Sequence, residues 1–149
     1  MIALRGEGAE VALAEAQAVL ALVHDPERRG RLADLVAAVQ DGELDDESAQ
    51  ALEELFELGL TSGRIRSVYG PGGEQAALKA YRKLPSGRAL TASAGEVTDA
   101  LAALAGRTLE DVKVQSVGPG SYIVTIAVDG LELSVRLDRT GARVHAVGV

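Results

Sequence analysis

The feature that most constrains the fold is a change of hydrophobic period at Gly106. Before this glycine, apolar residues recur at the three- and four-residue spacing of helices. After it they alternate with polar residues, which is typical of strands with one buried face. Residues 122–128 and 131–137 both alternate in this way, and the Asp129-Gly130 pair between them is a strong hairpin signal. The C-terminal third is therefore predicted to be antiparallel sheet.

Two further strands flank this hairpin. Val112 and Val114 mark the strand before it, and Val144 and Ala146 mark the strand after it. Tight turns are expected at 118–120, which reads Gly-Pro-Gly, and at 139–141, which ends in Gly. The result is a four-stranded antiparallel meander with one apolar face.

The first helices are delimited by residues that start or stop a helix. A mostly apolar helix is expected over 7–23, and Asp25 with Pro26 should cap and open a second helix over 26–40. Asp45 or Asp46 should cap a third helix, and Gly59 is a plausible stop for it.

The remaining helices lie on both sides of a glycine-rich break at 70–73. A short helical turn over 65–68 should precede the break, and a helix from about Gly73 to Leu84 should follow it. The last helix is expected over 86–105, with its start after Gly95 as the alternative, because glycine lowers helix stability by about 1 kcal/mol relative to alanine.

Together these patterns predict an α+β fold, with an N-terminal bundle of four to five helices followed by a helix packed on the four-stranded antiparallel β-meander. At 149 residues we expect a single domain over 1–149. If the chain divides, the helical part should be 1–85 and the helix-plus-meander part 86–149.

The C-terminal part also resembles a known class of module. Its helix is followed by a short meander with a D-x-x-G turn, Asp138 to Gly141. This arrangement resembles small secreted inhibitory or chaperone-like modules of the PepSY type. The resemblance implies a helix-and-meander fold, and no function is carried over from it.

Charge is distributed unevenly along the chain. Residues 32–63 contain nine acids and no Lys or Arg, whereas residues 64–88 contain six bases and one acid, Glu74. The first interpretation is internal pairing, which contributes little for each exposed pair. The second is a polarised surface that steers a charged partner or a second copy of the chain.

Residues 61–88, which include the basic segment 64–88, contain the candidate binding residues. Its glycine break opens a helix, and helix N-termini attract anions, although a plain turn between helices explains the same glycines. A basic patch beside this break would bind an anion or an acidic surface. The candidate residues are Arg64, Arg66, Tyr69, Gly72, Gly73, Arg82 and Lys83.

Several chemistries lack the residues they need. The chain has no cysteine and only two histidines, so we expect no metal site, no cofactor and no catalytic residues. The net charge of −7 argues against general binding to nucleic acid. The longest apolar stretch, 11–23, is too short to span a bilayer, so a cytoplasmic location is expected.

These observations favour a non-enzymatic protein-binding or assembly module that acts through protein–protein contacts. The alternative is a small-anion or nucleotide-sensing regulatory domain that uses the basic segment 64–88. The meander leaves two edge strands, near 112–117 and 143–147, and the first helix is apolar nearly all round. We therefore expect a homodimer or a stable hetero-complex.

Overall fold

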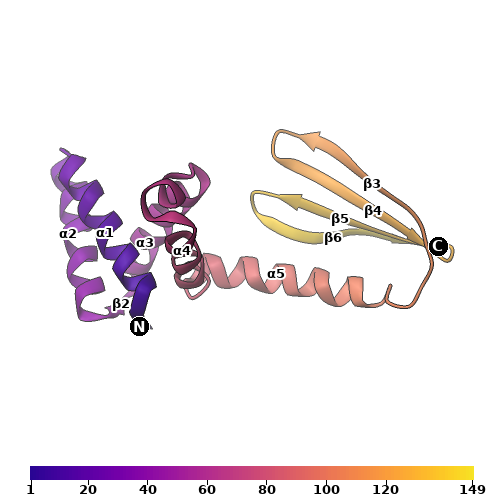
Figure 1. Cartoon of the computed structure of the whole chain (residues 1–149), viewed down its shortest axis with the longest axis horizontal. Helices are drawn as coiled ribbons and strands as arrows, with labels where there is room; N and C mark the ends of the chain where they lie inside the picture. The colour runs from indigo at the N-terminus through magenta and orange to yellow at the C-terminus, as the bar shows by residue number, and fades with distance from the viewer. The chain divides into compact units, whose positions relative to one another are not determined.

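The computed structural model describes all 149 residues and confirms the α+β fold, with five helices preceding a four-stranded antiparallel sheet (Figure 1). The helices are α1 (Gly6–Leu22), α2 (Pro26–Asp41), α3 (Asp46–Thr61), α4 (Arg64–Tyr81) and α5 (Pro85–Ala102). The large sheet contains β3 (Leu109–Gly118), β4 (Ser121–Val128), β5 (Leu131–Asp138) and β6 (Gly141–Gly148). A two-stranded sheet of β1 (Ile2–Ala3) and β2 (Glu43–Leu44) was not predicted.

The chain divides into two compact units, a helical unit over Met1–Arg88 and a sheet unit over Ala89–Val149. The sequence had suggested 85/86 as the place of division. Helix α5 begins in the helical unit and continues into the sheet unit as one helix. No break occurs at Gly95, so the alternative of a later start is wrong.

The predicted N-terminal caps of α2 and α3 are confirmed. The carboxylate of Asp25 accepts a hydrogen bond from the Arg28 amide at 2.9 Å, and Pro26 occupies the first helical position. The carboxylate of Asp45 accepts from the Ser48 amide at 2.8 Å. Hydrogen bonding to Ser48, first to its amide, also lowers the pKa of Asp45. Each cap satisfies an amide that has no partner within its own helix.

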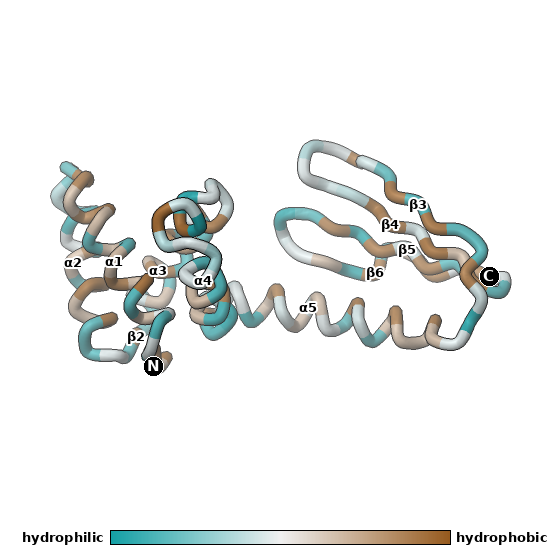
Figure 2. The backbone as a smooth tube through the Cα atoms, in the orientation of Figure 1, coloured by the Kyte–Doolittle hydropathy of each residue, from teal (hydrophilic) through white to brown (hydrophobic).

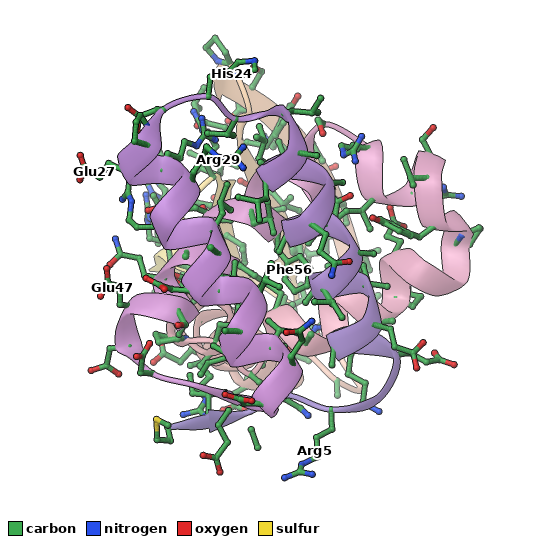
Figure 3. All side chains as sticks on the ribbon, turned by 90° about the vertical axis from the view of Figure 1, so that its left-hand side faces the viewer. Arg5, His24, Glu27, Arg29, Glu47 and Phe56 are labelled. Carbon is green, nitrogen blue, oxygen red and sulfur yellow. The ribbon has the colours of Figure 1, made fainter.

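The C-terminal end of α1 is closed by an arginine from α2. The Nη1 atom of Arg29 donates to the carbonyl oxygens of Leu20 and Val23, each at 2.8 Å. Figure 3 shows Arg29 directed toward the end of α1, near His24. A cation at this position also interacts favourably with the helix dipole.

Replacing Arg29 with alanine should therefore lower the free energy of unfolding by about 1 kcal/mol. Thermal and urea unfolding followed by circular dichroism would measure the change. Arg28→Ala is the matched control, because the Arg28 side chain makes no hydrogen bond or ion pair. Equal losses in both variants would contradict a specific role for Arg29.

Gly59 does not stop α3, and this prediction from the sequence is wrong. The helix continues to Thr61, and a Cβ atom added at Gly59 would lie 2.7 Å from Cδ1 of Ile65. Ile65 is fully buried in α4. The glycine is needed here because α3 and α4 approach each other closely, and its position in the sequence resembles a helix stop by coincidence.

The core of the helical unit surrounds Phe56, which is fully buried and points into the space among the helices in Figure 3. Other large buried side chains come from several elements of the unit. They are Leu4, Leu35, Leu44, Leu52, Ile65 and Leu84. Leu44 pairs with Ile2 in the small sheet, which fixes the N-terminal segment to the helices.

The first turn of α5 is fixed to α3 by a buried acid. The Glu53 side chain is 9% exposed, and its carboxylate accepts from the Ser86 amide at 2.7 Å and from the Ser86 hydroxyl at 2.9 Å. An acid at a helix N-terminus is favoured by the helix dipole. Glu53 therefore performs the capping function for α5 from a distant part of the sequence.

The glycine break lies inside α4 as a kink. Gly70 has φ of 75° and ψ of −179°, a backbone conformation that favours glycine, and Pro71 follows it. The two helical segments expected around the break are both present, and together they form Arg64–Tyr81. The kink changes the direction of α4 between its first part, with Ile65, and its second part, with Tyr81.

In the sheet unit every strand pairs with its neighbour in sequence, in the order β3-β4-β5-β6. Val124 is opposite Val114 and Val135, and Ile126 is opposite Val112 and Leu133. The apolar side chains therefore share one face, and Figure 2 shows hydrophobic and hydrophilic residues alternating along the strands. The predicted meander and its apolar face are confirmed.

The last strand departs from simple alternation. Val144 pairs with Val135, but Ala146 pairs with Ser134 because a bulge shifts the register between them. Ala146 consequently lies on the polar face, where the sequence did not place it, and Val147 takes the next apolar position opposite Leu133. A bulge inserts one extra residue and reverses the alternation beyond it.

Helix α5 covers only the middle of the apolar face. Val97 packs with the buried side chains of Leu133 and Val135, and Ala100, Leu101, Leu104 and Ala142 surround them. The β5–β6 turn lies against the same helix, since a Cβ atom added at Gly141 would lie 2.8 Å from Oγ of Ser93.

The carboxylate of Asp138, in the β5–β6 turn, has its pKa lowered to about 2, first by the hydrogen bond from the Thr140 hydroxyl.

Candidate functional site

The first residue of the basic segment is bound to a buried acid of α1. Nε and Nη2 of Arg64 lie 3.3 and 3.1 Å from the two carboxylate oxygens of Glu15. The Glu15 side chain is 1% exposed and that of Arg64 is 43% exposed. The ion pair raises the pKa of Arg64. The Arg64 guanidinium therefore neutralises a carboxylate inside the helical unit.

Tyr69 binds the same carboxylate. Its hydroxyl donates to Oε1 of Glu15 at 2.8 Å. Burial, and then this hydrogen bond, raise the pKa of Tyr69 to about 12, so the phenol is protonated at neutral pH and acts as a donor. Glu15 is the only charged residue between Val11 and Leu22, and an acid in such an apolar stretch is the sequence signal that could have indicated a buried partner for an arginine.

Arg66 and Glu74 form a second, exposed ion pair across the kink of α4, with Nη1 of Arg66 3.4 Å from Oε1 of Glu74. Arg64 and Arg66 therefore both form their ion pairs with acids outside the acidic stretch 32–63. The only hydrogen bond between that stretch and a side chain of α4 joins the Tyr81 hydroxyl, which donates, to the Glu57 carboxylate at 2.8 Å. Exposed pairs such as Arg66–Glu74 contribute little to stability.

Gly72 and Gly73 line a hollow of about 480 Å³ between α1 and α4, together with Tyr69. Two carboxylates, Glu7 and Glu10, also line it, and no cation does. The apolar part of the lining is Val11, Ala14 and Ala76. The two acids in this lining disfavour a phosphate or carboxylate ligand beside the glycines.

Arg82 and Lys83 follow α4 and are both exposed. Lys83 lines a separate hollow of about 240 Å³ with Arg5, Glu7 and Lys79. The seven candidate residues are therefore distributed over several places in the helical unit. Arg64 and Tyr69 share Glu15, the two glycines share the acidic hollow with Tyr69, and Lys83 lies with two other cations.

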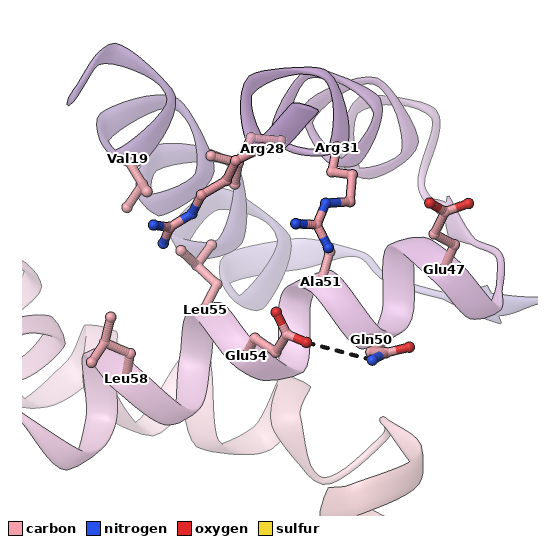
Figure 4. A pocket seen from close by; sticks show the side chains of 10 residues that line it. Val19, Arg28, Arg31, Glu47, Gln50, Ala51, Glu54, Leu55 and Leu58 are labelled. Carbon is pink, nitrogen blue, oxygen red and sulfur yellow. Dashed lines mark hydrogen bonds between the residues drawn. The ribbon is translucent and has the colours of Figure 1, made fainter. Parts of the chain in front are cut away.

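A further hollow, of about 220 Å³, was not predicted from the sequence. Arg28 and Arg31 extend from α2 toward α3, above Leu55 and beside Glu54 (Figure 4). The cations and acids are mixed in its lining, and Gln50 donates to Glu54 at 3.5 Å. No group of three or more His, Asp or Glu side chains is arranged to hold a metal ion.

Several exposed apolar side chains lie together on the apolar face of the sheet. Beyond the area that α5 covers, Val112 is 48% exposed, Val114 62% and Tyr122 46%. These three residues form the β3 margin of the apolar face. Val144 and Val147 form the β6 margin and are also exposed. Tyrosine is enriched in protein–protein interfaces.

Strand β3 also presents an open backbone edge. It is one of the two outer strands of the sheet, and every residue from Leu109 to Val117 is exposed. Its register is regular between Asp111 and Ser116, with shifts only near its two ends. Unpaired amides and carbonyls on an edge strand are a template for pairing with another strand.

Comparisons with known proteins give no assignment, because no protein-family model, no curated protein and no solved structure matches the chain. None of its helices has the length and apolar character needed to cross a membrane. The PepSY-type resemblance stays an expectation based on sequence pattern.

Proposed function

We propose that this chain is a non-enzymatic, cytoplasmic protein-binding or assembly module, and that it binds through the apolar face and open edge of its sheet. The observation that carries this proposal is the β3 margin, where Val112, Val114 and Tyr122 are uncovered beside an unpaired strand edge. Burying such side chains against a partner is favourable by about 25 cal/mol for each Å² of apolar surface.

The basic segment has less support as the binding surface. Its leading residue, Arg64, is bound to Glu15, and Arg66 is bound to Glu74. The anion-sensing alternative requires the arginines and the glycine break to lie side by side, so that they can bind the same anion. The hollow beside the glycines instead contains Glu7 and Glu10. The geometry therefore favours protein binding over anion sensing.

Site-specific photo-crosslinking in the cell that naturally makes this protein would test the proposal. A photo-reactive amino acid at position 114 reports on the apolar face, and one at position 132 reports on the polar face, where Glu132 is also exposed. We expect crosslinked protein adducts from position 114 at several times the yield from position 132. Equal yields, or no adduct from position 114, would contradict binding through the apolar face.

A further inference from the structure

We propose that β3 pairs antiparallel with β3 of a second copy of this chain, with the two-fold axis passing at Val112. This inference rests on the proposed function and specifies the partner of the same sheet. In this register Asp111 of each copy lies opposite Lys113 of the other copy, and Val112 lies opposite Val112. Opposed side chains in an antiparallel pair have Cβ atoms about 4.5–5.5 Å apart.

The charges of β3 select this register. An axis at Lys113 would put two lysines opposite each other, which is destabilising, and an axis at Val114 would put Lys113 opposite Gln115. The axis at Val112 forms two ion pairs by symmetry. Asp111 and Lys113 have no ion-pair partner within their own chain, so both charges are free to form them.

The other edge strand is not suited to pairing with itself. Strand β6 carries Arg143 and His145 but no acid that could face them. Its ladder also has a bulge near its middle, and bulges on edge strands hinder further pairing. The β3 edge lacks a central bulge and carries charges of both signs.

The pairing also places apolar surface in contact. Val112, which is 48% exposed on the apolar face beside the edge, would lie against Val112 of the other copy, and Val114 would lie opposite Glu110. In the dimer the two apolar faces would continue across the new strand pair as one eight-stranded sheet. Main-chain hydrogen bonds would supply affinity, and the charged side chains would determine the register.

Charge reversal on β3 provides the test. Asp111→Lys puts lysines opposite lysines, and Lys113→Asp puts aspartates opposite aspartates, so each variant alone should self-associate at least about tenfold more weakly than the wild type. An equimolar mixture of the two variants restores opposite charges at both positions. It should form a heterodimer, which native mass spectrometry identifies by its mass. The double variant Asp111→Lys with Lys113→Asp should self-associate like the wild type.

Glu132→Lys serves as the control, since it reverses a charge on the polar face of an inner strand and should leave self-association unchanged. Both β3 positions are exposed, so all variants should remain folded. Thermal melting would check this. A wild type that is monomeric at high micromolar concentration, single variants that associate normally, or a mixture without heterodimer would overturn the inference. Adducts from position 114 to a different protein would then still support the proposed function.

Discussion

Arg64→Ala is expected to lower the melting temperature of the helical unit by about 10 °C. The substitution leaves Glu15 with Tyr69 as its only hydrogen-bonding partner, in a site where its side chain is 1% exposed. Removing one member of such a pair is destabilising because the remaining carboxylate stays out of water without its counter-charge. Circular dichroism at a helix-sensitive wavelength would follow the transition.

Arg66→Ala is the matched control, because it removes an arginine of the same helix whose ion pair with Glu74 is exposed. Its melting temperature should stay within about 2 °C of the wild type. Similar shifts for the two variants would mean that burial of Glu15 does not distinguish the two pairs. A large shift for Arg64 alone would establish that the first arginine of the basic segment is structural.

Leu133→Asp is expected to unfold the sheet unit. Leu133 is 3% exposed and packs in an apolar cluster with Val97 of α5 and Val135 of its own strand. Burying an uncompensated charge in this position would lower the free energy of unfolding by more than about 4 kcal/mol. Hydrogen exchange measured by mass spectrometry would show whether protection is lost throughout Ala89–Val149.

Glu132→Lys changes the neighbouring residue, whose side chain lies on the other face and is exposed. We expect its free energy of unfolding to stay within about 0.5 kcal/mol of the wild type. The opposite ranking of the two variants would mean that the register of β5 is shifted by one residue, since a shift of one exchanges the two faces.

Local chemistry explains which parts of the fold could be predicted. Asp25 caps α2 by accepting a hydrogen bond from an amide three residues later, and the Asp129-Gly130 turn joins two adjacent strands, so short segments contain these signals in full. The roles of Gly59 and Ala146 depend on another element and could not be predicted locally. The absence of a side chain at Gly59 leaves room for Ile65 of α4, and a bulge in the β5–β6 ladder places Ala146 on the polar face.

The candidate site was less predictable than the fold. The sequence shows that residues 64–88 are basic. It does not show which of the many acids of this chain lies close enough to each arginine to form an ion pair, because that depends on the fold. The fold selected Glu15, which is 49 residues from Arg64, and the acidic stretch 32–63 provides no ion pair to the basic segment. The exposed β3 margin depends on how much of the sheet one helix covers, and no local pattern contains that information.

The anchoring of Ser86 by Glu53 has a consequence for how the chain is made on the ribosome. Glu15 and Glu53 are the buried carboxylates of the molecule, and their partners Arg64, Tyr69 and Ser86 all precede residue 89. Domains generally fold as units during synthesis, with the N-terminal one first. The nascent helical unit can thus satisfy its buried charges as soon as Ser86 has emerged, while β3, the open edge, is still inside the exit tunnel.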